Sequence, residues 1–328
     1  MAHPQQRPDV GVVRFYNFLP EGSSFLGEVR TGLALPQKAL PPKYFYDARG
    51  CRLFEQICKL PEYYPTRTEL AIMREHAAMM AKFLGPDCQL IEFGSGSSRK
   101  THILIEQLQP LLYVPIEIAG EAMQAAATSL AEAFPWLNIN GVCADYTGPL
   151  TLPVFVGVPI RRKAVYFPGS TIGNFTPEAA IEFLQHARRM VGAGGALLIG
   201  VDLKKDKLAL NAAYNDAAGV TAAFNLNLLA RINRELGGDF QLPRFRHRAF
   251  YNEDLGRIEM HLESLAAQFA HVGGERFSFG QSETILTEIS CKYSVDEFRA
   301  VARRAGFAPG QIWTDAAKLF SVHGMIAV

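Results

Sequence analysis

A short glycine-rich loop follows an apolar segment near residue 90. Residues 88–93 (CQLIEF) read as a buried strand, and Gly94, Ser95 and Gly96 come directly after it. Glycines at such a position let the backbone approach a bound ligand closely, because they lack a Cβ. The third glycine of the dinucleotide-binding fingerprint is missing, so the loop by itself is weak evidence for any one ligand.

Two acidic residues stand where the next two strands of the chain are expected to end. Glu117 is placed to accept hydrogen bonds from both hydroxyls of a ribose, and Asp145 is placed to accept one from an adenine amino group. A glycine loop followed by two strand-end acids is the arrangement of S-adenosylmethionine-dependent methyltransferases. Two alternatives stay open: a loop that only tightens a helix entry, and a nicotinamide dinucleotide site. The second would call for a third glycine and a catalytic His, Lys or Tyr set, which we do not find.

The elements that position these residues alternate between strand and helix. Apolar strands are predicted at residues 88–93, 112–118, 137–143, 163–167 and 195–201, and helices at 102–112, 121–134 and 177–191. Such alternation is typical of βαβ units, so we predict an α/β fold with a parallel sheet covered on both faces.

The flanking segments follow other patterns. We predict an extended arm at residues 1–20, a helix through residues 53–60, and a helix at 68–84 capped by Thr66 or Thr68. Residues 210–236 read as one long helix or two, followed by antiparallel strands that include residues 257–262 and 283–290. The tail returns to a helix at 294–305, capped by Ser294, and a strand within 316–328.

The whole-chain composition excludes several classes of protein. The 328 residues are 48% hydrophobic, which excludes global disorder and at roughly 100–200 residues per domain suggests two domains. Lys and Arg number 33 against 32 Asp and Glu, so the net charge is +1. This balance offers no electrostatic footprint for nucleic acid or for an anionic membrane, and we expect neither as a partner.

Targeting, metal and nucleophile signals are also missing from the sequence. No stretch of about 18 apolar residues or signal-peptide pattern is present, so we expect no membrane span and no secretion. The five cysteines form no CxxC pair, which favours reduced thiols in the cytoplasm. The eight histidines show no metal-ligand spacing, and no GxSxG motif is present, so neither a metal site nor serine hydrolase chemistry is expected.

Several longer motifs occur together in a fixed order. They are KYFYDARG at 43–50, LPEYYPTR at 60–67, FPGSTIGN at 167–174, GVDLKKD at 200–206, AYNDAAGVTAAFN at 213–225 and LTEISCK at 286–292. The set resembles the L-histidine Nα-methyltransferases of ergothioneine biosynthesis, from about Phe18 to near the C-terminus. The resemblance implies three methyl transfers from S-adenosylmethionine to the α-amino group of histidine, which give the betaine hercynine.

The resemblance also implies a domain layout. A Rossmann-like class I methyltransferase sheet would carry an inserted α+β domain for the substrate. We divide the chain into an arm and part of the substrate domain at 1–68, a cofactor-binding domain at 69–202, a substrate-binding domain at 203–291, and a return to the methyltransferase domain at 292–328. We expect a monomer.

Carried over by position, the resemblance implies two sets of site residues. The cofactor set is Gly94, Ser95, Gly96, Lys100, Glu117, Asp145 and Tyr146, where Glu117 stands in place of an expected Asp. The substrate set is Phe54, Tyr63, Asn174, Tyr214, Met260, Glu288 and Ser290, with Tyr46 as a proton relay. If the motif is aligned one residue further along the chain, Tyr64 takes the place of Tyr63 in this set.

These residue types suit methyl transfer to an amino acid. The reaction depends chiefly on positioning two reactants, and a neutral amine needs no strong base once it is desolvated. Asn174 and Tyr214 can donate hydrogen bonds to a carboxylate, while Glu288 and Ser290, two apart on a strand, share one face that can bind an imidazole. Met260 would supply an apolar wall. Two rival functions remain: methylation of another amino acid or small amine, and a non-catalytic S-adenosylmethionine-binding module.

Overall fold

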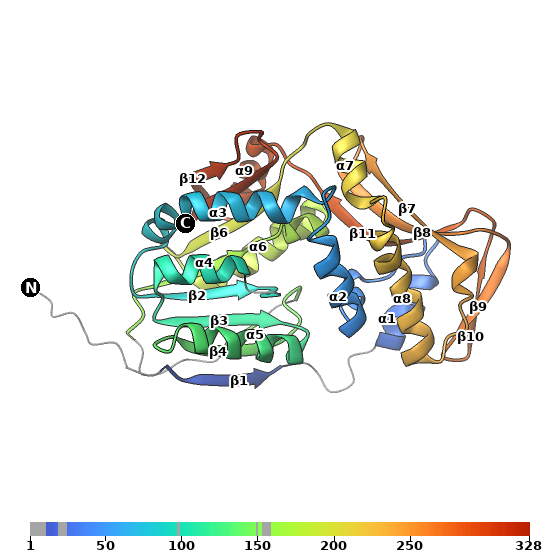
Figure 1. Cartoon of the computed structure of the whole chain (residues 1–328), viewed down its shortest axis with the longest axis horizontal. Coiled ribbons are helices and arrows are strands. Elements are labelled where there is room, and N and C mark those ends of the chain that lie inside the picture. The colour runs from blue at the N-terminus through green and yellow to red at the C-terminus, as the bar shows by residue number, and fades with distance from the viewer. Residues whose placement is uncertain (1–10, 19–24, 97–98, 149, 153–158) are drawn as a thin grey trace, which may run out of the picture.

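A computed structural model describes residues 11–18, 25–96, 99–148, 150–152 and 159–328. Its centre is an eight-stranded sheet (Figure 1). In spatial order the strands are β1 (Val13–Asn17), β4 (Asn138–Cys143), β3 (Leu112–Glu117), β2 (Cys88–Phe93), β5 (Arg162–Phe167), β6 (Ala196–Asp202), β13 (Phe320–Ala327) and β12 (Phe307–Thr314). The pairs are parallel except for those of β13, which runs antiparallel to both neighbours. The predicted α/β class is therefore confirmed, with one reversed strand.

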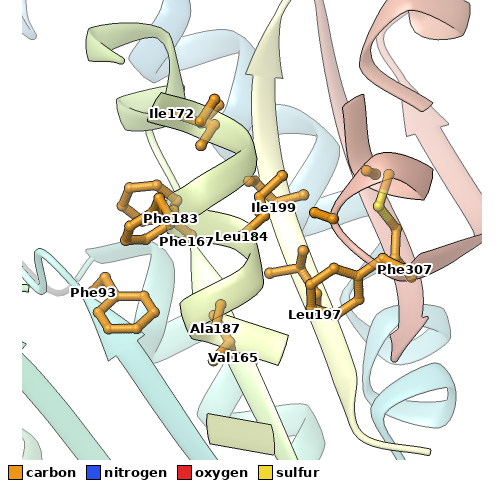
Figure 2. Close-up of a cluster of buried hydrophobic side chains, with 14 of the residues drawn as sticks. Phe93, Val165, Phe167, Ile172, Phe183, Leu184, Ala187, Leu197, Ile199 and Phe307 are labelled. Carbon is orange, nitrogen blue, oxygen red and sulfur yellow. The ribbon is translucent and has the colours of Figure 1, made fainter. Parts of the chain in front are cut away.

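Helices cover both faces of this sheet. One face packs against α3 (Tyr64–Leu84), α4 (Arg99–Leu108) and α5 (Gly120–Ala133), and the other against α6 (Pro177–Val191) and α9 (Val295–Arg304). Successive strand residues point to opposite faces, so Leu90 enters the first of these cores and Ile91 the second. Figure 2 shows the second core, where Phe183 and Leu184 of α6 lie over Phe167 and Ile199 of the sheet. Burial on both faces explains why most residues of these strands are apolar.

A third core lies beside the sheet and is built from two distant parts of the chain. The first part contains α1 (Phe25–Leu33), a 3₁₀ turn (η1, Pro42–Phe45) and α2 (Ala48–Ile57). The second contains α7 (Lys207–Tyr214), α8 (Val220–Leu236), β7 (Phe245–Asn252), β8 (Arg257–Ser264), β9 (Gln268–Val272), β10 (Glu275–Phe279) and β11 (Thr284–Cys291). Phe45 and Phe224 stack within it at 4.5 Å between ring centroids. We call these two parts the small lobe (Figure 1).

The expected N-terminal arm contains an edge strand where the structure describes it. Val13–Asn17 are extended and pair in parallel with Ile139–Cys143 as strand β1, a pairing that was not predicted. Most side chains of β1 are exposed, so the segment lacks the apolar alternation that announces a strand. Residues 1–10 and 19–20 of the expected arm, and Ser97 and Ser98 of the glycine loop, lie outside the described residues.

Several element boundaries also differ from the prediction. Helix α3 begins at Tyr64, and Thr68 lies inside it with its hydroxyl donating to the Tyr64 carbonyl at 2.9 Å, so neither predicted threonine caps the helix. Pro65 explains the earlier start, because proline suits a first helical turn. Helix α2 ends at Ile57, before Leu60. The tail strand β12 was missed, since its register is interrupted after Pro309.

Other expectations are confirmed. The segment 210–236 is two helices, α7 and α8, and β8 pairs antiparallel with β11. Ser294 caps α9: its hydroxyl accepts the backbone N–H of Glu297, and the Glu297 carboxylate accepts the backbone N–H of Ser294. Within the described ranges, no helix is both long and apolar enough to cross a membrane.

Candidate active site

The glycine loop adopts the backbone conformation that its glycines allow. Gly94 and Gly96 have φ angles of +69° and +43°, in the region that disfavours other residues. A Cβ on Gly94 would lie 3.3 Å from the Tyr146 hydroxyl oxygen. Ser95 is buried, and its hydroxyl has no hydrogen-bond partner among the described residues. The loop therefore offers a close backbone approach and an unpaired hydroxyl to a ligand.

The two strand-end acids lie at the same edge of the sheet as this loop. Glu117 ends β3, and its Oε1 accepts the backbone N–H of Ile118 at 2.9 Å. Burial raises the pKa of Glu117, which the backbone hydrogen bonds oppose. Asp145 follows β4; burial would raise its pKa, but hydrogen bonds from Thr147 and Lys43 bring it below its usual value. Both carboxylates can accept hydrogen bonds from an adenosine.

An aromatic wall adjoins these acids. The Tyr146 ring lies 5.5 Å from the Phe93 ring between centroids. With the loop and the two carboxylates it brings the predicted cofactor residues of β2, β3 and β4 to neighbouring strand ends. This donor set fits an adenosyl group: glycine backbone for close contact, carboxylates for hydroxyl and amino groups, and an aromatic face for the base.

Lys100 is held by a buried carboxylate. Its Nζ lies 2.6 Å from Oε2 of Glu69, whose side chain is fully buried in α3. The same carboxylate accepts the backbone N–H of Gly169 at 2.9 Å. A Cβ on Gly200 would come within 2.2 Å of Glu69 Oε1, so this arrangement requires glycine there. Glu69 thus joins α3, the start of α4 and the loop after β5.

The eight residues predicted for substrate binding and proton relay line one pocket. They are Tyr46, Phe54, Tyr63, Asn174, Tyr214, Met260, Glu288 and Ser290. They come from the small lobe, from the start of α3 and from the 3₁₀ turn η2 (Thr171–Asn174) after β5. The pocket therefore lies where the small lobe meets the carboxyl edge of the large sheet, on the side of the cofactor residues.

One wall of the pocket is aromatic. Phe54 lies between Tyr46 and Tyr63, with ring centroids 5.7 and 6.4 Å away, and the Tyr214 ring is 6.2 Å from that of Tyr63. Burial raises the pKa of Tyr46 well above its usual value, and the charge of Glu288 adds to this effect. Tyr146 and Glu117 contribute in the same direction.

The two adjacent tyrosines have different positions. Tyr63 lines the pocket, whereas the hydroxyl of Tyr64 donates to Asp202 at 2.8 Å. The rings diverge because Tyr63 precedes the helix while Tyr64 is its first residue. Of the two alternatives, Tyr63 is therefore the one that faces the pocket.

The opposite wall is the β8–β11 pair. Met260 and Glu288 are register partners, and Ser290 follows on the same face of β11. Burial raises the pKa of Glu288 to about 7, although the nearby Lys292 ammonium lowers it. The Glu288 side chain makes no hydrogen bond or ion pair within the described part of the chain. Its carboxylate is left to a ligand.

A buried ionic cluster in the wall of the pocket was missed by the sequence analysis. Lys292 Nζ lies 2.7 Å from Asp202 Oδ2, and Lys205 Nζ lies 2.5 Å from Asp202 Oδ1. Ser170, at φ +59°, accepts the Asp202 backbone N–H through its hydroxyl. Two features of the sequence point to this cluster. Asp202 stands at the end of a predicted strand, and Lys292 comes two residues after Ser290 and so lies on the same face. The described residues hold no group of three or more His, Cys, Asp or Glu arranged for a metal ion.

Comparison with known proteins agrees with this geometry. Residues 25–327 match the model of a family described as histidine-specific methyltransferase, SAM-dependent. The histidine N-alpha-methyltransferase of Mycolicibacterium smegmatis is 42% identical over 90% of this chain and 92% of its own length. The corresponding protein of Mycobacterium tuberculosis is 40% identical over 93% and 97%.

Solved structures are more distant. The CcbJ methyltransferase of Streptomyces caelestis superposes with a TM-score of 0.45 at 14% identity, covering 78% of this chain and 95% of that one. The predicted class I methyltransferase sheet and the dependence on S-adenosylmethionine are confirmed by the family match. Since that match spans the sheet and the small lobe alike, the chain belongs to the histidine-specific, S-adenosylmethionine-dependent methyltransferase family.

Proposed function

We propose that this enzyme transfers three methyl groups from S-adenosylmethionine to the α-amino nitrogen of L-histidine, forming hercynine at the first step of ergothioneine biosynthesis. One observation carries the proposal: the unpaired Glu288 carboxylate shares a pocket with the hydrogen-bond donors Asn174 and Tyr214. Such a pocket complements a small zwitterion that carries an N–H group on its side chain. The relatives named as histidine N-alpha-methyltransferases support the same substrate.

The pocket residues divide between the two ends of histidine. Asn174 and Tyr214 donate to the α-carboxylate, and Glu288 accepts an imidazole N–H beside the Ser290 hydroxyl. Met260 and the Phe54 ring cover the apolar surface of the imidazole ring. A site built around such bonds discriminates strongly against analogues that lack them, because its own buried polar groups would stay unpaired.

The cofactor residues position the second reactant. S-adenosylmethionine supplies an electrophilic methyl group. Gly94, Ser95 and Gly96 bind beside its amino-acid portion, Lys100 contributes a positive charge, and Glu117, Asp145 and Tyr146 bind the adenosyl portion. We propose these roles from the edge of the sheet that these residues share and from the loop conformation.

Tyr46, which lines the same pocket, acts on the substrate amine. Because its pKa is raised, Tyr46 stays a neutral phenol near pH 7. Rather than serving as a standing phenolate base, it acts as a relay: its oxygen takes the proton that the substrate nitrogen releases while its own O–H proton passes to water, so the phenol stays neutral. Burial in the pocket also disfavours the ammonium form of the substrate, which the reaction requires to lose a proton.

The wider setting follows from the same features. We infer a cytoplasmic monomer without nucleic-acid partners, supported by five unpaired cysteines and a net charge of +1. The division of the chain at residues 68, 202 and 291 is likewise proposed. It is supported by the small-lobe core, in which residues 29–64 pack with residues 210–285.

Product analysis tests the proposal. The purified protein is incubated with L-histidine and methyl-labelled S-adenosylmethionine, and the product is examined by NMR. The expected product carries three equivalent labelled methyl groups on the α-nitrogen. Label on an imidazole nitrogen would overturn the proposal. Cofactor binding by calorimetry without any methylated product would instead favour the non-catalytic module.

A further inference from the structure

Lys292 is buried in the wall of the pocket, and its ammonium contacts three groups. Its Nζ lies 2.7 Å from Asp202 Oδ2, 2.8 Å from Ser290 Oγ and 3.2 Å from Tyr214 Oη. An ammonium group has three N–H donors and no acceptor, so these contacts use all of its hydrogen-bonding capacity. Only 1% of the Lys292 side chain is exposed. Although Lys292 borders the pocket, its three donors are already engaged, so the residue acts through its neighbours.

These contacts fix the direction of two hydroxyl groups. Because Lys292 can only donate, the oxygens of Ser290 and Tyr214 must accept from it, and their own hydrogens point elsewhere. Both hydrogens can therefore be donated to a ligand in the pocket that the two residues line.

Asp202 holds Lys292 in this position. Burial opposes the charge on Lys292, but the Asp202 carboxylate raises the lysine pKa above its ordinary value and keeps the group an ammonium. Asp202 is itself fully buried and also binds Lys205 and the Tyr64 hydroxyl, each on Oδ1. Asp202 thus keeps a cationic partner even when Lys292 is removed.

We propose that Lys292, oriented by Asp202, is a positioning residue that turns the Tyr214 and Ser290 hydroxyls toward the substrate and so couples recognition of its carboxylate and of its imidazole. This inference rests on the proposed function, which places Tyr214 at the carboxylate and Ser290 at the imidazole. One ammonium would then serve both ends of the amino acid.

A matched pair of variants tests the inference. Lys292→Met and Lys205→Met each remove one buried ammonium from Asp202, but Lys205 contacts Tyr64 instead of the pocket hydroxyls. For Lys292→Met we expect the KM for histidine to rise about ten- to a hundredfold, as for a lost hydrogen bond to a charged group. The affinity for S-adenosylhomocysteine, measured by calorimetry, should stay at the wild-type value. Lys205→Met should leave the histidine KM near that of the wild type.

Two further readouts separate positioning from a loss of structure. Adding Tyr214→Phe to Lys292→Met should cost less than the product of the two single effects, because both changes remove the same contact. The preference for histidine over histidinamide should also shrink in Lys292→Met. If Lys292→Met fails to fold, the double variant Asp202→Asn/Lys292→Met replaces it in these measurements. The double variant removes both charges of the pair, so no buried carboxylate is left without Lys292.

Several outcomes would contradict the inference. Equal KM increases in the two lysine variants would overturn it, as would full additivity with Tyr214→Phe. An unchanged preference over histidinamide would do the same. These results are distinct from a wild-type protein that does not methylate histidine at all, because that result removes the proposed function first and this inference with it.

Discussion

Met260 and Glu288 face each other across the β8–β11 pair, as register partners on the side of the sheet that lines the pocket. Met260 is buried and apolar, whereas Glu288 has a carboxylate without a protein partner in the described structure. The pair places the apolar Met260 side chain beside the Glu288 carboxylate, which is a hydrogen-bond acceptor. This combination suits an imidazole ring, so the two residues define the side-chain specificity that we propose.

Removing the charge of Glu288 should weaken the use of histidine. In Glu288→Gln the side chain keeps its size but loses the charged acceptor, so we expect kcat/KM for histidine to fall about ten- to a hundredfold. Steady-state kinetics measures this effect. Glu259→Gln is the matched control, since Glu259 lies one residue from Met260 on the opposite face of β8 and pairs with Arg257. Similar losses in the two variants would contradict the assignment.

The same substitution should change how stability depends on pH. Burial raises the pKa of Glu288 from 4.5 to about 7, so between these values the folded state binds more protons than the unfolded state. The free energy of unfolding contributed by this group therefore falls as the pH rises through that window. Glu288→Gln should gain melting temperature relative to the wild type when the pH is raised from about 4.5 to about 7. A constant difference across that range would show that Glu288 is not perturbed by burial.

Glu117 should affect the cofactor and not the fold. Its carboxylate ends β3 beside the glycine loop, and we expect Glu117→Ala to weaken S-adenosylhomocysteine binding about ten- to a hundredfold, through lost hydrogen bonds to a charged acceptor. Calorimetry measures the change. Glu132→Ala is the control, because Glu132 is exposed on α5. Wild-type affinity in Glu117→Ala would remove this residue from the proposed cofactor site.

Gly200 should tolerate no side chain. A Cβ there would approach Glu69 Oε1 to 2.2 Å, and Glu69 is fully buried and bound to Lys100. We expect Gly200→Ala to lower the free energy of unfolding by about 1–3 kcal/mol, as overpacking does. Chemical denaturation measures the loss. In Gly148→Ala a new Cβ meets no atom of the described residues within 4 Å, so that variant should match the wild type. Equal stability of all three proteins would refute the close contact.

Much of the architecture is predictable from the sequence because burial leaves a local pattern. Strands buried on both faces, such as residues 88–93, are rich in apolar residues, and the glycines after them have few other uses. Edge strand β1 carries mostly exposed side chains and is held by backbone pairing, so its sequence lacks such a pattern. The start of α3 was misplaced because a threonine within a first turn looks like a cap, while Pro65 was the better signal.

The site was predictable where motifs carry it and not where tertiary contacts do. The eight residues predicted for substrate and proton relay converge on one pocket because the long motifs place them at loops and strand positions that the fold brings together. The Asp202–Lys292 pair lies 90 residues apart in the chain, and its meaning appears only when β6 and β11 lie near each other. A buried lysine cannot be told from an exposed one by its letter alone.

The most direct test of the central claim is a competition among substrates. The purified protein is given S-adenosylmethionine and all twenty amino acids together, and mass spectrometry identifies what is methylated. We expect trimethylated histidine as the dominant product. Faster methylation of any other amino acid, or no methylated amino acid after long incubation, would contradict it.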